Sequence, residues 1–171
     1  MNQIPEKVVN FNAYNNVNKL IGVTGEVTLP NLEPMTETIS GAGLLGEYES
    51  VSQGHFGSTP VEIQFRTLTN QSFSMQEMAG QVLTLRAAQQ GYDVSKGVVS
   101  HRALKITLKG QPKGINPGKI GVNAATETTT VLEATYIKIE EGGKVLLELD
   151  KINFIYIVNG KDQLATLRNM I

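Results

Sequence analysis

The sequence contains no cysteine among its 171 residues. This absence excludes a disulfide framework, a thiolate zinc site and a cysteine nucleophile. No apolar run approaches the ~18 residues that a membrane-spanning helix needs. The first residues, MNQIPEKVVNF, also lack the basic segment and the apolar run of a secretion signal. We therefore expect a protein without a membrane anchor that is made in a cytoplasm.

Charged residues are scarce as well. They make up 18% of the chain, against roughly 25% in an average soluble domain, and the formal net charge is -1. A surface short of charge and close to neutrality favours association over dispersal. The charges are segregated: residues 20–65 carry no basic group, and residues 94–126 carry no acidic group. The acidic run comprises Glu26, Glu33, Glu37, Glu47, Glu49 and Glu62, and the basic run comprises Lys96, Arg102, Lys105, Lys109, Lys113 and Lys119.

Three interpretations of this segregation are open. The basic run could bind nucleic acid, because phosphate contacts need clustered Lys and Arg. The two runs could instead form complementary surfaces that meet between copies of the same protein. Folding could also interleave them into an ordinary mixed surface. The slightly acidic isoelectric point and the lack of aromatic residues in the basic run count against nucleic acid.

Residues 41–46, GAGLLG, fit the dinucleotide fingerprint G-x-G-x-x-G. That fingerprint binds a pyrophosphate only where a helix begins within it. Here Gly54, Gly57 and Pro60 interrupt the following stretch before a helix could cross back. Because a lone fingerprint is weak evidence, we interpret these glycines as part of a flexible interface loop. A nucleotide-dependent enzyme is the alternative.

Other catalytic signatures are missing. His55 lies in the glycine-rich stretch and His101 opens a predicted strand, so the two histidines lack the spacing of metal ligands. The sequence has no G-x-S-x-G elbow and no Walker sequence. The adjacent carboxylates Glu140 and Glu141 fall at a predicted hairpin turn, where we expect solvated surface. We therefore predict no enzymatic activity, no cofactor and no metal site.

The strongest structural signal is the stretch at residues 128–158. Residues 131–139 carry the β-branched and aromatic residues that suit a strand. Gly142 and Gly143 then suit a two-residue hairpin turn, because glycine accepts a positive φ. The return run at residues 145–150 alternates apolar and polar side chains, with one exception. This pattern predicts an antiparallel meander.

The third run of the meander, residues 152–158, is apolar on both faces. Both faces of such a strand must be buried, one against the core of its own domain and the other against a further element. The burial of the second face is the first indication of a partner. We predict that Ile155 and Ile157 contribute to a subunit interface.

The rest of the chain predicts further strands and two helices. The capping-box spacing at Ser74 predicts a helix that ends at Gly80, with Met75 and Met78 facing the sheet. A short final helix is expected behind a cap at Asp162. Strands are expected at residues 8–20 around an asparagine turn, 25–29, 35–40, 61–68, 82–87 and 101–109, and a loop at 111–123.

The glycine-rich residues 41–60 show no regular period. A loop of ~20 residues without structure of its own is uncommon in a compact domain, and such loops are usually functional or disordered. Bulky apolar residues scattered through this stretch argue against a purely solvated segment. We predict an inter-subunit loop at about 40–60 that lies on a neighbouring subunit through Leu44, Leu45, Tyr48, Val51 and Phe56.

Four motifs, in this order and spacing, carry a family resemblance. They are VTLPNL at residues 27–32, SGAG at 40–43, LKGQPKGINPGK at 108–119, and the stretch from Thr135 to the C-terminus that begins TYIKIEEGGKVLLELDK. With them the chain resembles the major tail tube proteins of contractile-tailed bacteriophages and of the related R-type bacteriocins. The SGAG that imitates a nucleotide loop belongs to this family pattern.

The resemblance implies a single mainly β (α+β) domain over residues 1–171. We expect an antiparallel β-sandwich or barrel-like tail-tube subunit with one flanking helix and a short C-terminal helix. The implied function is structural: hexameric rings stack head to tail into a hollow inner tube, the conduit for genome delivery through the host envelope. The implied partners are further copies of the chain and the sheath, tape measure and baseplate tube proteins. The implied location is the virion.

A lumen that passes DNA without specific binding should be polar and not basic, because clustered cations would hold phosphate strongly. Glu26, Glu33, Glu37 and Glu62 are therefore candidates for lumen-facing residues. Arg102, Lys105, Lys109, Lys113 and Lys119 are candidates for a complementary basic surface away from the lumen. Two alternatives stay open at this point: the tube of a phage-derived bacteriocin or contractile injection system, and a small β-barrel module that binds nucleic acid.

Overall fold

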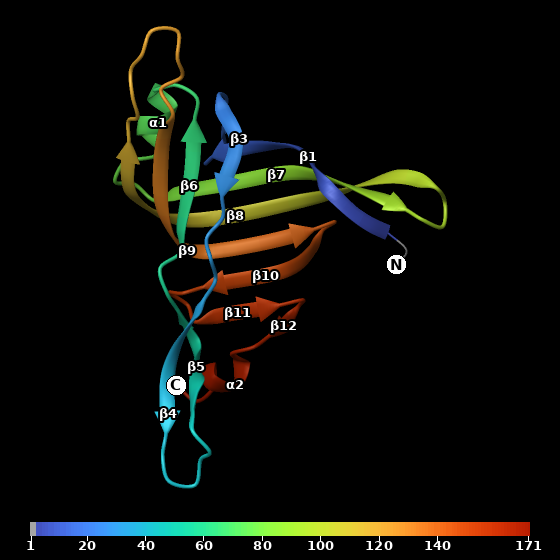
Figure 1. Cartoon of the computed structure of the whole chain (residues 1–171), viewed down its shortest axis with the longest axis vertical. Coiled ribbons are helices and arrows are strands. Elements are labelled where there is room, and N and C mark those ends of the chain that lie inside the picture. Colours follow the sequence, from blue (N-terminus) through green and yellow to red (C-terminus); the bar gives the residue numbers. More distant parts are fainter. Residues whose placement is uncertain (1–2) are drawn as a thin grey trace.

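The structure, a computed structural model, describes residues 3–171, with the side chains of all of them except residues 23 and 24. It is dominated by antiparallel strands, as expected (Figure 1). The strands are β1 (Gln3–Asn15), β2 (Asn18–Leu20), β3 (Val23–Thr28), β4 (Pro34–Ser40), β5 (Glu47–Phe56), β6 (Pro60–Phe65), β7 (Gln81–Asp93), β8 (Val98–Asn116), β9 (Thr128–Glu141), β10 (Lys144–Asp150), β11 (Ile155–Val158) and β12 (Lys161–Asp162). The helices are α1 (Asn70–Ser74) and α2 (Ala165–Arg168), and neither is long and apolar enough to cross a membrane.

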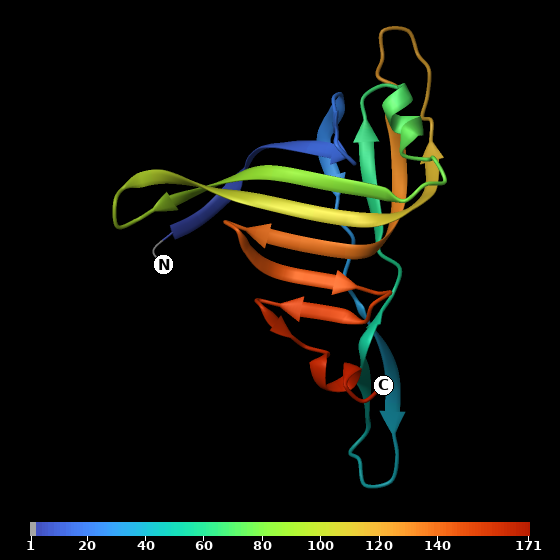
Figure 2. The same cartoon turned by 180° about the vertical axis from the view of Figure 1, so that it is seen from behind.

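Ten of these strands form one sheet, in the order β12-β11-β10-β9-β8-β7-β1-β2, with β3 and β6 attached as a branch. Figure 2 shows β7 to β12 lying side by side. The branch arises because β9 has two different neighbours along one edge. Its residues 128–133 pair with β6, and its residues 136–141 pair with β10. The sheet therefore branches at the middle of β9, with β6 and β3 on one branch and β10 to β12 on the other.

The branch point needs a glycine on the adjacent strand. The register between β8 and β9 shifts at Gly110, opposite the fork. A Cβ added to Gly110 would lie 2.0 Å from the carbonyl oxygen of Glu133, far inside van der Waals contact. Only glycine lets the two backbones approach this closely at the bend.

The core lies where the branch packs against the long strands. From β6, Val61, Ile63 and Phe65 are at most 1% exposed. Leu83 of β7 and Ile137 of β9 join them in the same buried cluster. The alternation of apolar and polar residues that predicted these strands therefore selects the face that forms the core.

Several local predictions are confirmed. The meander of β9, β10 and β11 is present, and Gly142 and Gly143 turn the first hairpin with φ of 55° and 81°. Asn16 turns β1 into β2 with φ of 54°. A short helix, α2, is present near the C-terminus as expected, but its N-cap is Leu164; Asp162 instead accepts a hydrogen bond from the Leu164 amide at 3.0 Å and forms the turn before the helix. Each of these features depends on residues close together in the chain.

Other predictions were wrong. The third run of the meander begins at Ile155, because Asp150 caps a turn by accepting hydrogen bonds from the Ile152 and Asn153 amides, both at 3.0 Å. The predicted loop at residues 111–123 is strand up to Asn116, since β8 continues past two bulges to stay paired with β9.

The helix prediction was misplaced by several residues. The N-cap is Thr69, whose amide donates to the Ser72 hydroxyl at 3.4 Å, and the helix ends at Ser74, where the prediction had it begin. Met75 is fully buried, as expected for core filler, but Met78 is fully exposed.

The largest correction concerns residues 41–60. They are not an irregular loop: residues 47–56 form β5, which pairs with β4 as a separate two-stranded sheet. Only the connection at residues 41–46 is a turn, with the Leu44 amide bonded to the Gly41 carbonyl at 3.2 Å. The glycine fingerprint therefore connects two antiparallel strands, and strand rather than helix follows it.

Candidate subunit-contact surfaces

The β4–β5 hairpin projects from one end of the molecule, beyond the rest of the fold (Figure 1). Within the described residues, neither of its strands pairs with any other strand. Four of the predicted interface residues are exposed on it: Leu44 at 46%, Leu45 at 111%, Tyr48 at 55% and Val51 at 54%. Exposed apolar side chains on two free strand edges are typical of a segment that packs against a partner.

Phe56, the fifth predicted interface residue of this stretch, lies at the base of the hairpin and packs within its own chain. Its ring meets Tyr156 of β11 edge-on, with centroids 5.0 Å apart. Gly54 makes room for a different ring, since a Cβ there would lie 2.6 Å from Phe154. Next to these residues is an open groove of about 200 Å³ whose walls include Pro34 and Leu164.

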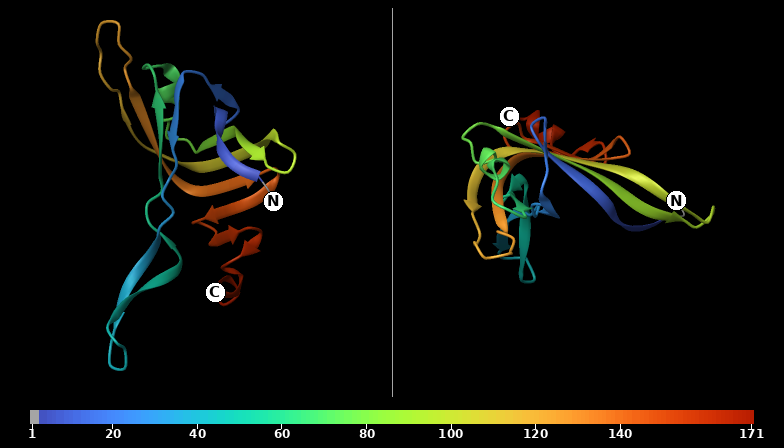
Figure 3. Two further views of the ribbon diagram at one scale, coloured as in Figure 1. Left: turned by 45° about the vertical axis from the view of Figure 1, so that its right-hand side comes forward. Right: turned by 90° about the horizontal axis from the view of Figure 1, so that it is seen from above.

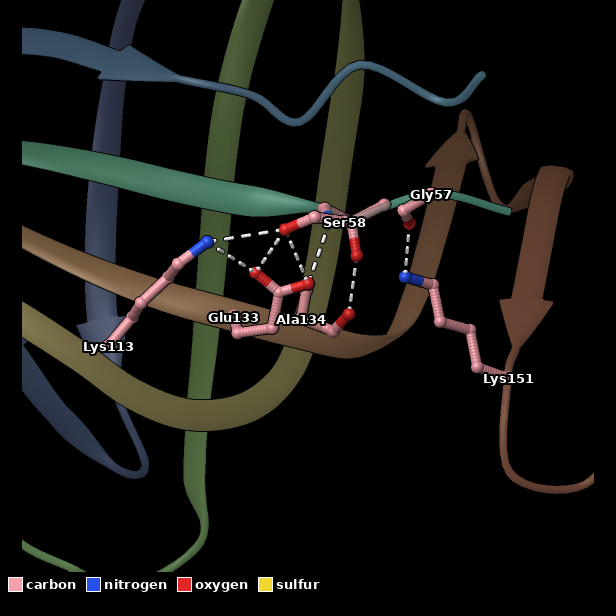
Figure 4. Close-up of polar contacts among 7 residues, drawn as sticks. Gly57, Ser58, Lys113, Glu133, Ala134 and Lys151 are labelled. Carbon is pink, nitrogen blue, oxygen red and sulfur yellow. Dashed lines mark hydrogen bonds and ion pairs between the residues drawn. The ribbon is translucent and has the colours of Figure 1, made fainter. Parts of the chain in front are cut away.

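A polar cluster anchors the hairpin base to the fork of the main sheet (Figure 4). The Glu133 carboxylate accepts hydrogen bonds from the Thr59 amide at 2.8 Å and from the Ser58 hydroxyl at 2.8 and 3.0 Å. Lys113 of β8 donates to the same carboxylate at 3.3 Å. A second anchor is Lys151, whose Nζ donates to the Gly57 carbonyl at 2.7 Å.

The electrostatics of this cluster favour an ionised Glu133. Partial burial by itself raises the pKa of this carboxyl. The Thr59 amide, the Ser58 hydroxyl and Lys113 outweigh burial, so the pKa lies below its usual value. The Thr59 hydroxyl also donates to the Ala134 carbonyl at 2.5 Å, so side-chain and backbone bonds meet at the point where β9 changes neighbours.

The predicted basic surface is largely neutralised within the chain. Arg102 pairs with Glu141 at 3.0 Å, Lys105 with Glu140 at 3.7 Å, Lys113 with Glu133 at 3.3 Å and Lys119 with Glu127 at 3.1 Å. Three of these acids belong to β9 and the fourth directly precedes it. None belongs to the acidic run, so the basic run is paired within the chain without interleaving the two runs. That these cations face another subunit stays a prediction.

Lys109 completes the basic set and makes no close ion pair among the described residues. Burial raises the pKa of Asp150, but hydrogen bonds from Asn153 and Ile152 and, after them, the charge of Lys109 hold that pKa below its usual value. Its Nζ lies 4.8 Å from the centroid of the Tyr136 ring. The Tyr136 hydroxyl donates to Glu148 at 2.9 Å, and burial together with this carboxylate raises the pKa of Tyr136 to about 12. The outer face of β8, β9 and β10 is thus a network of mixed charge.

The four predicted lumen residues are all exposed but do not form one row. Glu26 on β3 and Glu62 on β6 occupy neighbouring paired strands. Glu37 is on the hairpin, and Glu33 lies in the connection between β3 and β4. Their position relative to a lumen stays a prediction.

Ile155 and Ile157 are half-buried on β11. They pair with Asp150 and Glu148 of β10 and so lie on the polar face of the sheet, opposite the core. Tyr156, between them, packs against the core. The two-sided apolar character of β11 is therefore real, and the role of Ile155 and Ile157 in an interface stays a prediction.

Two further exposed regions were missed from the sequence. One is the arm where the outer parts of β1, β7 and β8 extend sideways (Figure 3, right). Ile4, Tyr92 and Val99 are opposite one another across its three strands and are 53%, 37% and 51% exposed. The sequence signal that could have indicated this exposed apolar surface is the pair of VV doublets at residues 8–9 and 98–99.

The second missed region is the loop at residues 117–127. It carries Ile120 and Val122, which are 96% and 101% exposed. Its glycine and proline content predicted a loop, but the two apolar residues within it were not singled out.

The comparisons with known proteins agree on one family. The chain matches the family described as phage tail tube protein FII over residues 5–171. It is 29% identical to the tail tube protein of Escherichia phage P2, with 98% of each chain covered. It is 27% identical to the major tail tube protein of Serratia phage KSP20, with 93% of this chain and 91% of the relative covered.

Among solved structures, the chain is similar in fold to components of an extracellular contractile injection system. One is from its PVC sheath-tube complex in the extended state, with a TM-score of 0.55, 11% identity, and 80% of this chain and 91% of the other covered. Another is from its sheath/tube terminator, with a TM-score of 0.56, 10% identity, and 80% and 96% covered.

Proposed function

This chain belongs to the phage tail tube protein FII family and is a structural tail tube subunit, and we propose that it forms hexameric rings that stack head to tail. The stacked rings form the hollow inner tube of a contractile tail. The observation that carries this proposal is the extent of the match. The family spans residues 5–171, and the relative from phage P2 is covered over 98% of its length, so subunit and relative correspond from end to end.

The exposed features of the subunit support self-assembly. A closed ring needs heterologous contacts, in which one patch meets a different patch on the next copy, and a second such contact along the axis gives an open stack. The outer edge of β1 is unpaired within the described residues over residues 3–12, and the hairpin has two free edges. Pairing such edges between copies would remove sites of disordered aggregation.

The tube is the conduit for genome delivery through the host envelope. We place Glu26, Glu33, Glu37 and Glu62 toward the lumen, because a polar, non-basic wall lets DNA pass without being held. The self-neutralised basic set supports this, since paired cations attract phosphate less strongly. The other partners are a sheath around the tube, a tape measure protein within it and baseplate tube proteins at its end.

The two curated relatives come from phages, which favours a virion over a bacteriocin or an injection device. The subunit is then synthesised and assembled in the bacterial host cytoplasm and is carried in the virion tail. Peptides of this chain in purified, DNA-filled particles would support this. Their presence only in particles without a genome would assign the tube to a bacteriocin or an injection device.

The direct test is electron microscopy of the purified subunit at rising concentration. Hollow rods, or rings with a central hole, are the expected result. A subunit that stays a single compact chain at every concentration would overturn the proposal. Gel-shift with duplex DNA distinguishes the alternative module: tight, salt-sensitive binding by the monomer would favour nucleic-acid recognition.

A further inference from the structure

The loop at residues 117–127, called the apical loop below, is held in a defined shape at its base. The Lys119 amide donates to the Thr126 carbonyl at 3.0 Å, and the Thr126 amide donates to the Arg66 carbonyl at 3.0 Å. Gly118 has φ of 83°, and a Cβ there would lie 1.9 Å from the Thr126 oxygen. The Thr128 hydroxyl closes the base by donating to the Pro117 carbonyl at 3.0 Å.

This closed base presents two apolar side chains to solvent. Ile120 and Val122 are each almost fully exposed. A loop that served only as a connection would gain nothing from an isoleucine and a valine at its tip, because exposed aliphatic groups favour burial. The closed base of the loop instead holds both side chains in a position where a partner can bury them.

The apical loop and the β4–β5 hairpin lie at opposite ends of the longest axis of the molecule (Figure 1). Viewed along that axis, they lie on the same side and nearly overlap (Figure 3, right). A second copy displaced along the axis therefore brings its hairpin to the apical loop of the first copy. The hairpin reaches that position with Leu44 and Leu45 in its turn and Tyr48 beside them.

The charges of the two ends do not oppose their contact. The hairpin strands β4 and β5 carry Glu37, Glu47 and Glu49 and no lysine or arginine. The apical loop has Lys119 and Glu127, which pair with each other, so the loop is neutral. An anionic hairpin tip therefore meets no excess of like charge at the loop.

We infer that the apical loop is the docking site for the β4–β5 hairpin tip of the next copy along the tube. Ile120 and Val122 of one copy pack against Leu44, Leu45 and Tyr48 of the next. This inference rests on the proposed tube. It names the two surfaces of this chain, the hairpin tip and the apical loop, that meet where one copy stacks on the next.

One such contact is small. It involves five side chains, far fewer than the ~20–30 residues a side of a stable protein interface. Free subunits therefore do not stack through it as monomers. Subunits joined in a ring present several copies of the contact at once, and the linked contacts bind much more strongly than one. Ring closure thus precedes stacking.

Engineered disulfides test the contact directly, because the chain has no cysteine. The variant Leu45→Cys with Val122→Cys is assembled into rods, oxidised and separated on a non-reducing gel. Each chain would bond to one neighbour above and one below, so we expect a ladder of multimers. The matched control is Leu45→Cys with Val94→Cys, in the turn between β7 and β8 and 54% exposed, which should give no ladder.

The outcomes separate this inference from the proposed function. Rods without a ladder in Leu45→Cys/Val122→Cys would overturn the docking site and leave the tube standing. Dimers in Leu45→Cys alone would show hairpins meeting hairpins, and this also overturns it. Failure of the unmodified chain to form rings or rods would instead contradict the tube itself.

A second variant removes the contact without cysteines. Ile120→Asp with Val122→Asp should abolish rods and leave single rings, with an unchanged thermal melting temperature because both side chains are exposed. Rods of normal length from this variant would contradict the inference.

Discussion

Replacing Glu133 with alanine should detach the hairpin base from the main sheet. Thr59 is fully buried, and its amide would lose the Glu133 acceptor. An unsatisfied buried amide costs about 1–3 kcal/mol. The partly exposed pair with Lys113 adds roughly 0.2–1 kcal/mol. We therefore expect Glu133→Ala to lower the free energy of unfolding by about 2–3 kcal/mol.

For a domain of this size, 1 kcal/mol corresponds to roughly 2–4 °C in Tm, so Tm should fall by about 5–10 °C. The assay is thermal and urea unfolding followed by circular dichroism, at a concentration below assembly, since association would add to apparent stability. The control is Glu127→Ala, which removes an ion pair whose partners are both about 70% exposed and should change stability by less than about 0.5 kcal/mol. Equal effects of the two substitutions would refute the anchoring role.

The pH dependence gives a second readout. Because the pKa of Glu133 is lowered in the folded state, its contribution is present above the unfolded pKa, about 4.3, and is lost as pH falls through the folded value. The stability difference between the unmodified chain and Glu133→Gln should therefore be constant near neutral pH and shrink below about pH 4. A difference that persisted unchanged to lower pH would contradict a role for the charge.

Three further predictions concern the fold and its surface. Gly110→Ala should destabilise the subunit by about 1–3 kcal/mol or more in urea unfolding, because a Cβ has no room at the fork. Gly41→Ala, which meets nothing within 4 Å, is its control. Met75→Ala should cost about 2–5 kcal/mol, whereas Met78→Ala should be nearly neutral. The unassembled subunit should show no salt-sensitive affinity for duplex DNA in a gel-shift, since four of the five cations of the predicted basic surface pair with Glu127 or with acids of β9.

The meander illustrates what neighbouring residues predict well. Its strands, its two-glycine turn and the inward face of β10 follow from alternation and from the positive φ that glycine accepts. These features involve residues that are close in sequence, so a short window contains the physical information. The exposed hairpin residues Leu44 and Leu45 were found for the same reason, since bulky apolar side chains stood out in a polar, glycine-rich stretch.

The strand at residues 47–56 shows why other parts of the fold could not be predicted from a short stretch of sequence. Its sequence has no clean alternation, and it is a strand because β4 supplies hydrogen-bond partners across the turn. The burial of Met75 and exposure of Met78 depend likewise on where α1 ends relative to the sheet, and not on helical spacing.

Composition and pattern alone determined a β-rich chain without disulfides, and the order of four motifs pointed to the tail tube family. Only the tertiary structure decided that the basic run meets acids of β9, because that pairing is set by the register of strands distant in sequence. It also decided that Glu133 holds Ser58 and Thr59, more than 70 residues away. Such contacts depend on where the sheet forks, and a fork is a property of the whole sheet rather than of any one segment.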